Sequence, residues 1–207
     1  MKAIKWVGVA ALAAVAGAAQ AADEGNWMVR ARALYMNVDN DNSGGLNGAL
    51  GKVEAENKVF PEVDVTYFFT PNIAAELILT YPQKHDVELA GSDIGSIKHL
   101  PPTLTLQYHF NPTGTIRPYA GLGVNYTRFS SVDLNVGGTT PLKIDRDSWG
   151  WAVQVGADYQ LAPQWFFNVD LKYVTIDTDI YVKANDTKVT KLDINPLLFS
   201  VGIGYRF

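Results

Sequence analysis

The chain has 207 residues, of which 18% are charged, and it contains 18 glycines and no cysteine. The charged fraction is below the roughly 25% of an average soluble domain, and the lack of cysteine excludes disulfide bonds, thiolate metal sites and a cysteine nucleophile. The formal net charge of −4 disfavours nucleic acid as a partner, because proteins that bind it present basic surfaces to the phosphates.

Residues 1–21 have the pattern of a secretory signal peptide. Two lysines precede a run of small apolar residues from Trp6 to Ala19, and small residues flank a cleavage site after Ala21. The apolar run is too short for a membrane-spanning helix. We therefore expect the exported protein to comprise residues 22–207, with a net charge of (17 − 2) − 21 = −6.

The rest of the chain alternates apolar and polar residues. The first such segment, WMVRARALYMNV, has Trp27, Val29 and Ala31 on one face and two arginines on the other. A period of two is typical of a strand with one apolar face, and no later stretch approaches the 18 or so uninterrupted apolar residues of a helical membrane span. In chain order, the predicted strands are 27–38, 57–69, 73–81, 103–110, 116–129, 149–161, 165–175 and 192–207.

One face of these strands carries full charges in mid-strand, five of each sign, together with several glycines. Alternation alone also fits a soluble barrel or sandwich whose apolar face turns inward. Balanced charges beside small residues instead indicate a narrow lumen, in which each ion has a partner that offsets its desolvation. The predicted lumen charges are Arg30, Arg32, Glu62, Asp64, Glu76, Arg117, Asp158, Asp170, Lys172 and Arg206.

The apolar face is aromatic near the strand ends, which indicates an interfacial girdle with aliphatic residues between its two rings. The segments also match the roughly 9 to 11 residues that a tilted strand needs to cross a bilayer core. Both observations favour a membrane barrel whose apolar face contacts lipid. The aromatic residues at the strand ends are Trp27, Tyr67, Phe69, Tyr108, Phe110, Tyr159, Trp165, Phe167, Tyr205 and Phe207.

Short and long connections alternate between the predicted strands. The short ones, at 70–72, 111–115 and 162–164, contain proline or asparagine suited to tight turns. The long ones, rich in Gly, Asn and Asp, are 37–56, 82–102, 130–148 and 176–191. We therefore predict an all-β fold, an eight-stranded antiparallel transmembrane β-barrel with short periplasmic turns and four long extracellular loops. The last strand should pair with the first, because hydrocarbon leaves unpaired backbone groups unsatisfied.

Four stretches across the exported chain resemble the outer-membrane protein W family. They are KHLPPTLTLQYHF, RPYAGLGVNYT, DSWGWAVQVGADYQL and FSVGIGYRF, in that order. The resemblance implies a barrel of Gram-negative outer membranes whose interior admits small hydrophobic molecules and releases them sideways into the bilayer. The closing stretch also resembles the signal read by the outer-membrane assembly machinery, with Tyr205 and Phe207 as its aromatic residues.

Members of this family narrow the lumen with inward apolar side chains. Alignment of NIAAELILTYP implies that Ile78 is one of them, whereas the partner position on the seventh strand, where an aromatic is expected, is Lys172. Other inward apolar residues either line a hydrophobic passage or simply fill the barrel, since eight-stranded interiors are barely wider than side chains. These further candidates are Leu34, Met36, Phe60, Phe68, Phe166 and Leu198.

The motifs of metal sites and enzymes are incomplete or missing. DNDNSGG, at residues 39–45, matches the first half of a calcium loop, but the position of the bidentate glutamate is Leu50. His109 is expected to be a hydrogen-bonded lumen histidine. There is no Gly-x-Ser-x-Gly, and the strand pattern brings no serine, histidine and acid together. We therefore expect no metal, no cofactor and no enzymatic activity.

Two functional hypotheses remain. In the first, the barrel is a narrow channel or pocket for passive uptake of small hydrophobic molecules. In the second, it is a structural barrel whose loops contact lipopolysaccharide, phage or host surfaces. The expected partners are outer-membrane lipid and lipopolysaccharide, a small hydrophobic ligand and the assembly machinery, and the expected location is the outer membrane. Apolar residues within the long connections, such as Leu134, Leu142 and Ile144, favour the first hypothesis.

Overall fold

The computed structural model describes residues 25–38, 53–54, 58–89, 92–136, 140–193 and 195–207. The predicted signal peptide lies outside these ranges, so its removal stays a prediction. The described residues form fourteen strands. No helix among them is long and apolar enough to cross a membrane.

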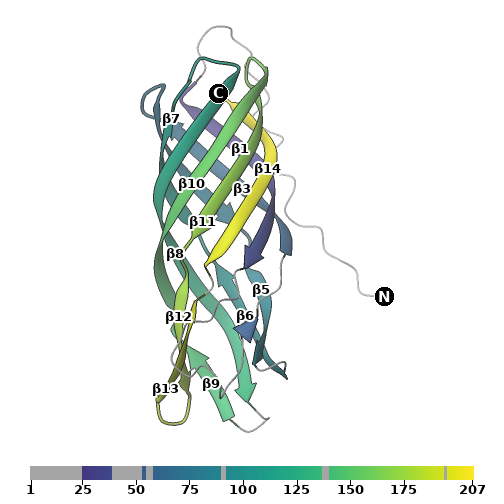
Figure 1. Ribbon diagram of the computed structural model, residues 1–207, viewed down its shortest axis with the longest axis vertical. Coiled ribbons are helices and arrows are strands. Elements are labelled where there is room, and N and C mark those ends of the chain that lie inside the picture. The colour runs from purple at the N-terminus through teal and green to yellow at the C-terminus, as the bar shows by residue number, and fades with distance from the viewer. Residues whose placement is uncertain (1–24, 39–52, 55–57, 90–91, 137–139, 194) are drawn as a thin grey trace, which may run out of the picture.

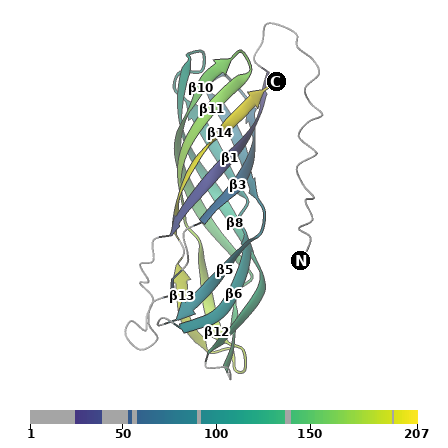
Figure 2. The same cartoon turned by 90° about the vertical axis from the view of Figure 1, so that its right-hand side faces the viewer.

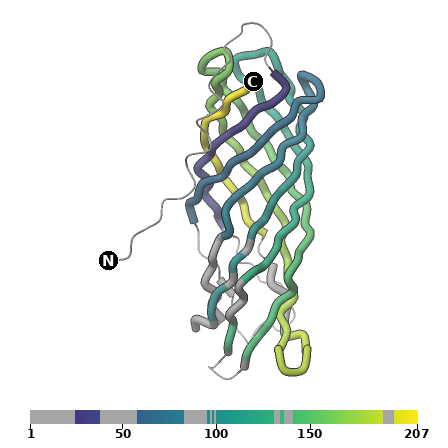
Figure 3. Tube along the Cα trace, turned by 180° about the vertical axis from the view of Figure 1, so that it is seen from behind, coloured from purple at the N-terminus to yellow at the C-terminus, as the bar shows by residue number. Residues whose placement is uncertain are grey.

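Eight of the strands close into an antiparallel barrel, as predicted (Figures 1 and 3). They are β1 (Trp27–Val38), β3 (Lys58–Phe68), β4 (Ile73–Thr80), β7 (Thr103–His109), β8 (Ile116–Val136), β10 (Asp147–Ala162), β11 (Trp165–Val174) and β14 (Pro196–Arg206). Each pairs with the next in this order, and β14 pairs with β1. Because the ring has no free edge, its backbone groups find partners without water.

The first and last strands of the barrel, β1 and β14, pair with each other and close the ring. The register of β1 and β14 runs from Met28 opposite Arg206 to Val38 opposite Pro196. Beyond it, Trp27 N donates to Phe207 O at 3.1 Å, and Phe207 N donates to Trp27 O at 2.8 Å. The predicted pairing of the last strand with the first is thus confirmed.

The apolar face of the barrel strands points outward. On β7, Leu104, Leu106 and Tyr108 are at least half exposed, whereas Thr105 and Gln107 between them are about 1% exposed. A soluble barrel has the reverse arrangement. The predicted orientation, with the apolar face toward lipid and the polar face toward a lumen, is confirmed.

Aromatic side chains encircle the barrel near both of its ends. At one end, residues 69–72, 110–115 and 163–164 connect neighbouring strands, and we call this the short-turn end. It carries the aromatic pairs Trp27–Tyr67 and Trp165–Tyr205, whose ring centroids are 4.8 and 5.0 Å apart. Toward the opposite, long-loop end, Tyr126 and Trp149 lie 4.9 Å apart. Such girdles suit the two interfaces of a bilayer.

Much of the long loops is itself β structure, which the sequence analysis did not anticipate. These strands extend the barrel beyond its membrane-crossing part (Figures 1 and 2). They are β2 (Val53–Glu54), β5 (Gln83–Leu89), β6 (Ser92–Leu100), β9 (Thr140–Ile144), β12 (Asp177–Val182) and β13 (Lys188–Asp193). β8 continues for 21 residues because β6 and β9 pair with its outer part, past the ends of β7 and β10.

We expect Gly202→Ala to destabilise the barrel by about 1–3 kcal/mol, the usual cost of overpacking. A Cβ at this position of β14 would meet the backbone oxygen of Ala31 and the Cγ of Arg32, so the new side chain would force β14 away from β1. The free energy of unfolding in urea, measured in lipid vesicles, reports the effect. Gly204→Ala is the matched control, because its nearest contact is a side-chain atom, Arg30 Cγ, at 3.0 Å. Equal losses in the two variants would contradict the prediction.

Candidate functional site

The interior of the barrel has three layers that follow the inward positions of its strands. From the short-turn end outward, β1 contributes Met28, Arg30, Arg32, Leu34 and Met36. The antiparallel strand β3 has the same order in reverse, with Phe60, Glu62, Asp64, Thr66 and Phe68. We call the layers the inner apolar layer, the polar network and the outer apolar layer.

The inner apolar layer fills the lumen at the short-turn end. It consists of Met28, Phe68, Ala74 and Phe166. The guanidinium carbon of Arg206 lies 3.9 Å from the ring centroid of Phe68, and that of Arg117 lies 4.8 Å from the ring of Phe166. These cation–π contacts cover the layer. Arg206 Nε also donates to Gly25 O at 2.7 Å.

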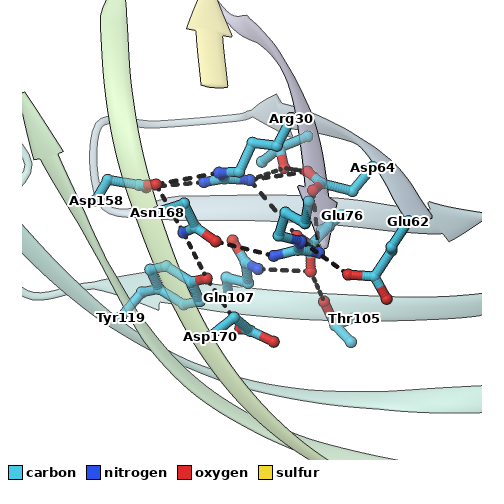
Figure 4. A network of polar contacts seen from close by, with 12 residues as sticks. Arg30, Glu62, Asp64, Glu76, Thr105, Gln107, Tyr119, Asp158, Asn168 and Asp170 are labelled. Atoms are coloured by element: carbon cyan, nitrogen blue, oxygen red, sulfur yellow. Dashed lines mark hydrogen bonds and ion pairs between the residues drawn. The ribbon is translucent and has the colours of Figure 1, made fainter. Parts of the chain in front are cut away.

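Arg30 lies at the centre of the polar network and is fully buried (Figure 4). Its Nε and Nη2 donate to the two carboxylate oxygens of Asp158 at 3.1 and 2.8 Å, a bidentate geometry that strengthens a charged hydrogen bond. Its Nη1 donates to Asp64 Oδ1 at 2.9 Å and to Thr66 Oγ1 at 2.8 Å. One side chain therefore ties β1 to its neighbour β3 and, across the lumen, to β10.

Arg32 and Lys172 form the side of the polar network that faces the long-loop end. Arg32 Nε lies 2.8 Å from Glu62 Oε1, and its Nη2 lies 3.0 Å from Asp64 Oδ2 and 3.2 Å from Glu76 Oε1. Lys172 Nζ donates to the other oxygen of Glu62 at 3.2 Å. The three cations thus share carboxylates, and removing any one of them would affect several ion pairs.

The polar network has more carboxylates than cations, and neutral side chains donate hydrogen bonds to these carboxylates. Arg30, Arg32 and Lys172 face the five carboxylates of Glu62, Asp64, Glu76, Asp158 and Asp170, which gives a formal charge of 3 − 5 = −2. Gln154 Nε2 donates to Glu76 at 2.8 Å and to Asp170 at 2.7 Å, and Tyr119 Oη donates to Asp170 at 2.9 Å. Further donors to the acids are Thr105, Gln107 and Asn168. A buried carboxylate accepts such bonds in place of water.

The outer apolar layer fills the lumen on the long-loop side of the polar network. It extends from the barrel strands into the outer strands β9 and β12. Its members are Leu34, Met36, Phe60, Phe129, Leu134, Leu142, Ile144, Ala152, Val174, Ile176 and Ile180, with Val182 and Leu198 packed against them. The outer part of the lumen is thus mainly apolar, although it also holds the buried polar residues Thr103, Asn125, Thr127, Ser148 and Thr178.

A cavity of about 30 Å³ lies where the outer apolar layer meets the polar network. Five of the six predicted channel-lining residues surround it, namely Leu34, Met36, Phe60, Ile78 and Lys172. The sixth, Phe166, lies in the inner apolar layer, on the other side of the polar network. A space of this size holds about one water molecule, so side chains fill the lumen at this level.

Most of the predicted lumen charges meet in one network, and the sequence analysis did not identify Tyr119 as a member of it. Tyr119 falls at an inward position between Arg117 and Gly121, so the period of two could have revealed it. A tyrosine also suits the lipid interface, which hides its role in a sequence. His109, as expected, is buried and hydrogen-bonded, with Nε2 3.2 Å from Gln107 Oε1.

The remaining site predictions concern metal binding and assembly. Residues 39–45, with their partial calcium loop, lie outside the described residues. Within the described part of the chain, no three His, Asp or Glu side chains are grouped to hold a metal ion. Tyr205 and Phe207 lie at the short-turn end, with ring centroids 6.2 Å apart. Their role as an assembly signal stays a prediction.

The sequence of the protein matches known outer-membrane barrels. The sequence profile of the OmpW family matches residues 23–207. The chain is 38% identical over 213 residues to outer membrane protein W of Vibrio cholerae serotype O1, and the match covers 97% of each protein. The chain belongs to the OmpW family. The resemblance found in the sequence is thereby confirmed, and this OmpW-family barrel resides in the outer membrane, with its short-turn end toward the periplasm.

Two further comparisons extend this result. The barrel superimposes on the crystal structure of OprG from Pseudomonas aeruginosa with a TM-score of 0.73 and 32% identity, covering 89% of this chain and 97% of OprG. The chain is also 37% identical over 123 residues to a Pseudomonas aeruginosa protein named dibenzothiophene metabolism operon protein PahQ, covering 58% of this chain and 56% of that protein. The OmpW-family fold is therefore shared with a solved barrel.

We expect Arg30→Met to destabilise the barrel by about 3–5 kcal/mol, because the substitution keeps the apolar stem but leaves buried Asp158 without its cation and Asp64 with Arg32 alone. Unfolding in urea from lipid vesicles measures the loss. Lys188→Met is the control for an exposed ion pair. Lys188 Nζ lies 2.6 Å from Asp179 Oδ2, and its side chain is 52% exposed, so its loss should cost about 0–1 kcal/mol. Similar losses in both variants would show that the buried network carries no special weight.

Proposed function

We propose that this OmpW-family barrel mediates passive uptake of small hydrophobic molecules, with lateral release into the membrane. The observation that carries the proposal is the continuous outer apolar layer, which leads from the outer strands to Ile78 and ends at the polar network. An apolar lining offers a hydrophobic molecule a favourable environment on the extracellular side.

The polar network argues against a straight path to the periplasm. To pass it, an apolar molecule would have to separate Arg30 and Arg32 from their carboxylates, and each group left unpaired would carry a large desolvation penalty. The inner apolar layer below it is closed by Phe68 and Phe166. A sideways exit above the network avoids both obstacles, and the hydrocarbon of the bilayer is a favourable destination for such a molecule.

The name of one relative supports an apolar substrate. PahQ is named for a dibenzothiophene metabolism operon, and dibenzothiophene is a flat aromatic molecule with little polar surface. We extend this only to the class of substrate: small, neutral or weakly polar, and largely hydrocarbon.

A structural role is the alternative, and one observation favours it. The cavity beside Ile78 has a volume of about 30 Å³, far below the roughly 300 Å³ of the smaller ligand sites. Uptake therefore requires side chains of the outer apolar layer to move aside. If they do not, the barrel is a plugged scaffold whose outer strands contact lipopolysaccharide, phage or host surfaces.

We expect Ala152→Phe to reduce uptake of a small hydrophobic probe such as naphthalene by roughly tenfold, a barrier increase of about 1.4 kcal/mol. Ala152 is buried in the outer apolar layer, so a phenyl ring there would fill the proposed path. Ala33→Phe is the matched control, because Ala33 is exposed on the lipid-facing side of β1. Uptake is measured as appearance of the probe inside cells that express each variant at equal folded levels.

Ile78→Arg provides a second test at the end of the proposed path. A guanidinium in place of Ile78 would make the apolar side of the cavity polar, so uptake should again fall. If cells without the protein, cells with the native protein and cells with either inward variant take up naphthalene at the same rate, passive uptake is wrong and the structural alternative is favoured.

A further inference from the structure

The barrel wall has an opening between β8 and the chain that follows β9. At the outer end of β8, Leu134 pairs with Leu142. Nearer the membrane, Arg128 pairs with Asp147 at the start of β10. Between these pairs, β8 is paired with β6 on its other side, and β9 turns to pair with β12. One backbone hydrogen bond, from Phe129 N to Arg146 O at 2.7 Å, crosses the edge of the opening that lies nearer the membrane.

A cavity of about 560 Å³ occupies this opening. Its residues come from two chemical classes. Phe129, Leu142 and Ile144 are members of the outer apolar layer, so the cavity has an apolar floor that continues into the lumen. Four of the other five described residues are cations, and none of these five is an acid: Arg128, Lys143, Arg146 and Lys183, with Ser130 as the fifth.

Neighbouring acids pair only weakly with the cations around the opening, so these cations can still attract an anionic ligand. Arg128 lies 3.6 Å from Asp147, and Lys143 lies 2.5 Å from Asp186, but both pairs are 43% exposed or more and exposed pairs are weak. Arg146 and Lys183 are exposed and form no ion pair with any described residue. Other acids nearby are Asp145 and Asp179, which contact Tyr181 Oη.

The opening lies close to the level of the outer membrane surface. Arg128 and Asp147 directly follow the outer aromatic pair of Tyr126 and Trp149 along the two strands, and Tyr126 Oη donates to Asp147 Oδ1. Aromatic girdles mark the level of the interface. The opening therefore lies just outside the hydrocarbon, where the polar head of an amphipathic molecule and its apolar tail can both be accommodated.

We propose that this opening binds small amphipathic anions, specifically hydrophobic monocarboxylates, with the carboxylate between Arg146 and Lys183 and the apolar body on Phe129, Leu142 and Ile144. The inference rests on the proposed function, since it names a substrate class for the same apolar lumen. Its volume of about 560 Å³ suits a small ligand and is too small for a whole lipopolysaccharide. A neutral molecule of the same shape gains only the apolar part of the interaction.

The test compares decanoate with 1-decanol, which share an apolar chain and differ in head-group charge. Each is titrated into the full protein in nanodiscs of zwitterionic lipid, and binding is followed by the NMR shift of the Ile144 methyl group. The native protein should bind decanoate more tightly. Arg146→Gln with Lys183→Gln should weaken decanoate about 3- to 10-fold and leave decanol unchanged, and added salt should weaken decanoate alone.

A matched control removes two positive charges elsewhere in the outer half of the protein. Lys58→Gln with Lys188→Gln changes the net charge equally at residues that do not line the cavity, so it should leave the preference for decanoate in place. Because all four positions are polar and at least partly exposed, neither double variant should perturb folding, and the dispersion of the methyl spectrum checks this.

The outcomes separate this inference from the proposed function. Equal affinity for the two probes, or equal effects of the two double variants, would overturn the anion site even if naphthalene uptake depends on the protein. Loss of lipopolysaccharide retention in the Arg146→Gln, Lys183→Gln protein with decanoate affinity unchanged would assign the cations to lipid phosphate and overturn it as well. Conversely, a decanoate preference with no naphthalene uptake would support the anion site and contradict the proposed function.

Discussion

The absence of water from the bilayer core is the constraint on which the rest of the structure depends. It obliges every backbone amide and carbonyl in the membrane to find a partner within the protein, and the closed ring of eight strands meets that requirement. Closure has a second effect. The side chains that alternate away from lipid are enclosed in a space little wider than themselves, so charged ones must be paired there. The polar network around Arg30 is therefore a consequence of closure as well as a support for it.

The layering of the interior connects this architecture to function. Charges occupy the middle of the lumen and mainly apolar residues occupy its outer part, so a molecule that suits one layer interacts unfavourably with the next. Under the proposed function, the outer apolar layer would receive a hydrophobic molecule from the extracellular side, and the polar network would bar its way to the periplasm. The opening between β8 and the chain that follows β9 lies on the apolar side of this barrier, so the proposed ligand would meet its cations without disturbing the polar network.

The membrane-crossing part of the fold could be predicted from the sequence because lipid and lumen impose opposite preferences on alternate residues. The segment 27–38 has the bounds of β1. Ile78 and Lys172, which the family resemblance singled out and whose parity is inward, lie beside the same cavity. Outside the membrane water satisfies the backbone and relaxes the alternation, so the strands of the long loops were not foreseen. Phe166 was grouped with the channel residues because parity gives the direction of a side chain but not its depth. The opening and its four cations arise from pairing between distant strands, which no local pattern reveals.

Strand β14 contributes space rather than charge to the middle of the lumen. Its inward residues there are Gly202 and Gly204, which lie against the stems of Arg32 and Arg30, and none of the ion pairs found among the described residues of the polar network involves β14. The charges of the polar network lie instead on β1, β3, β4, β10 and β11. Displacement of β14 would therefore break none of these ion pairs, because β14 is held to β1 and β11 by backbone pairing.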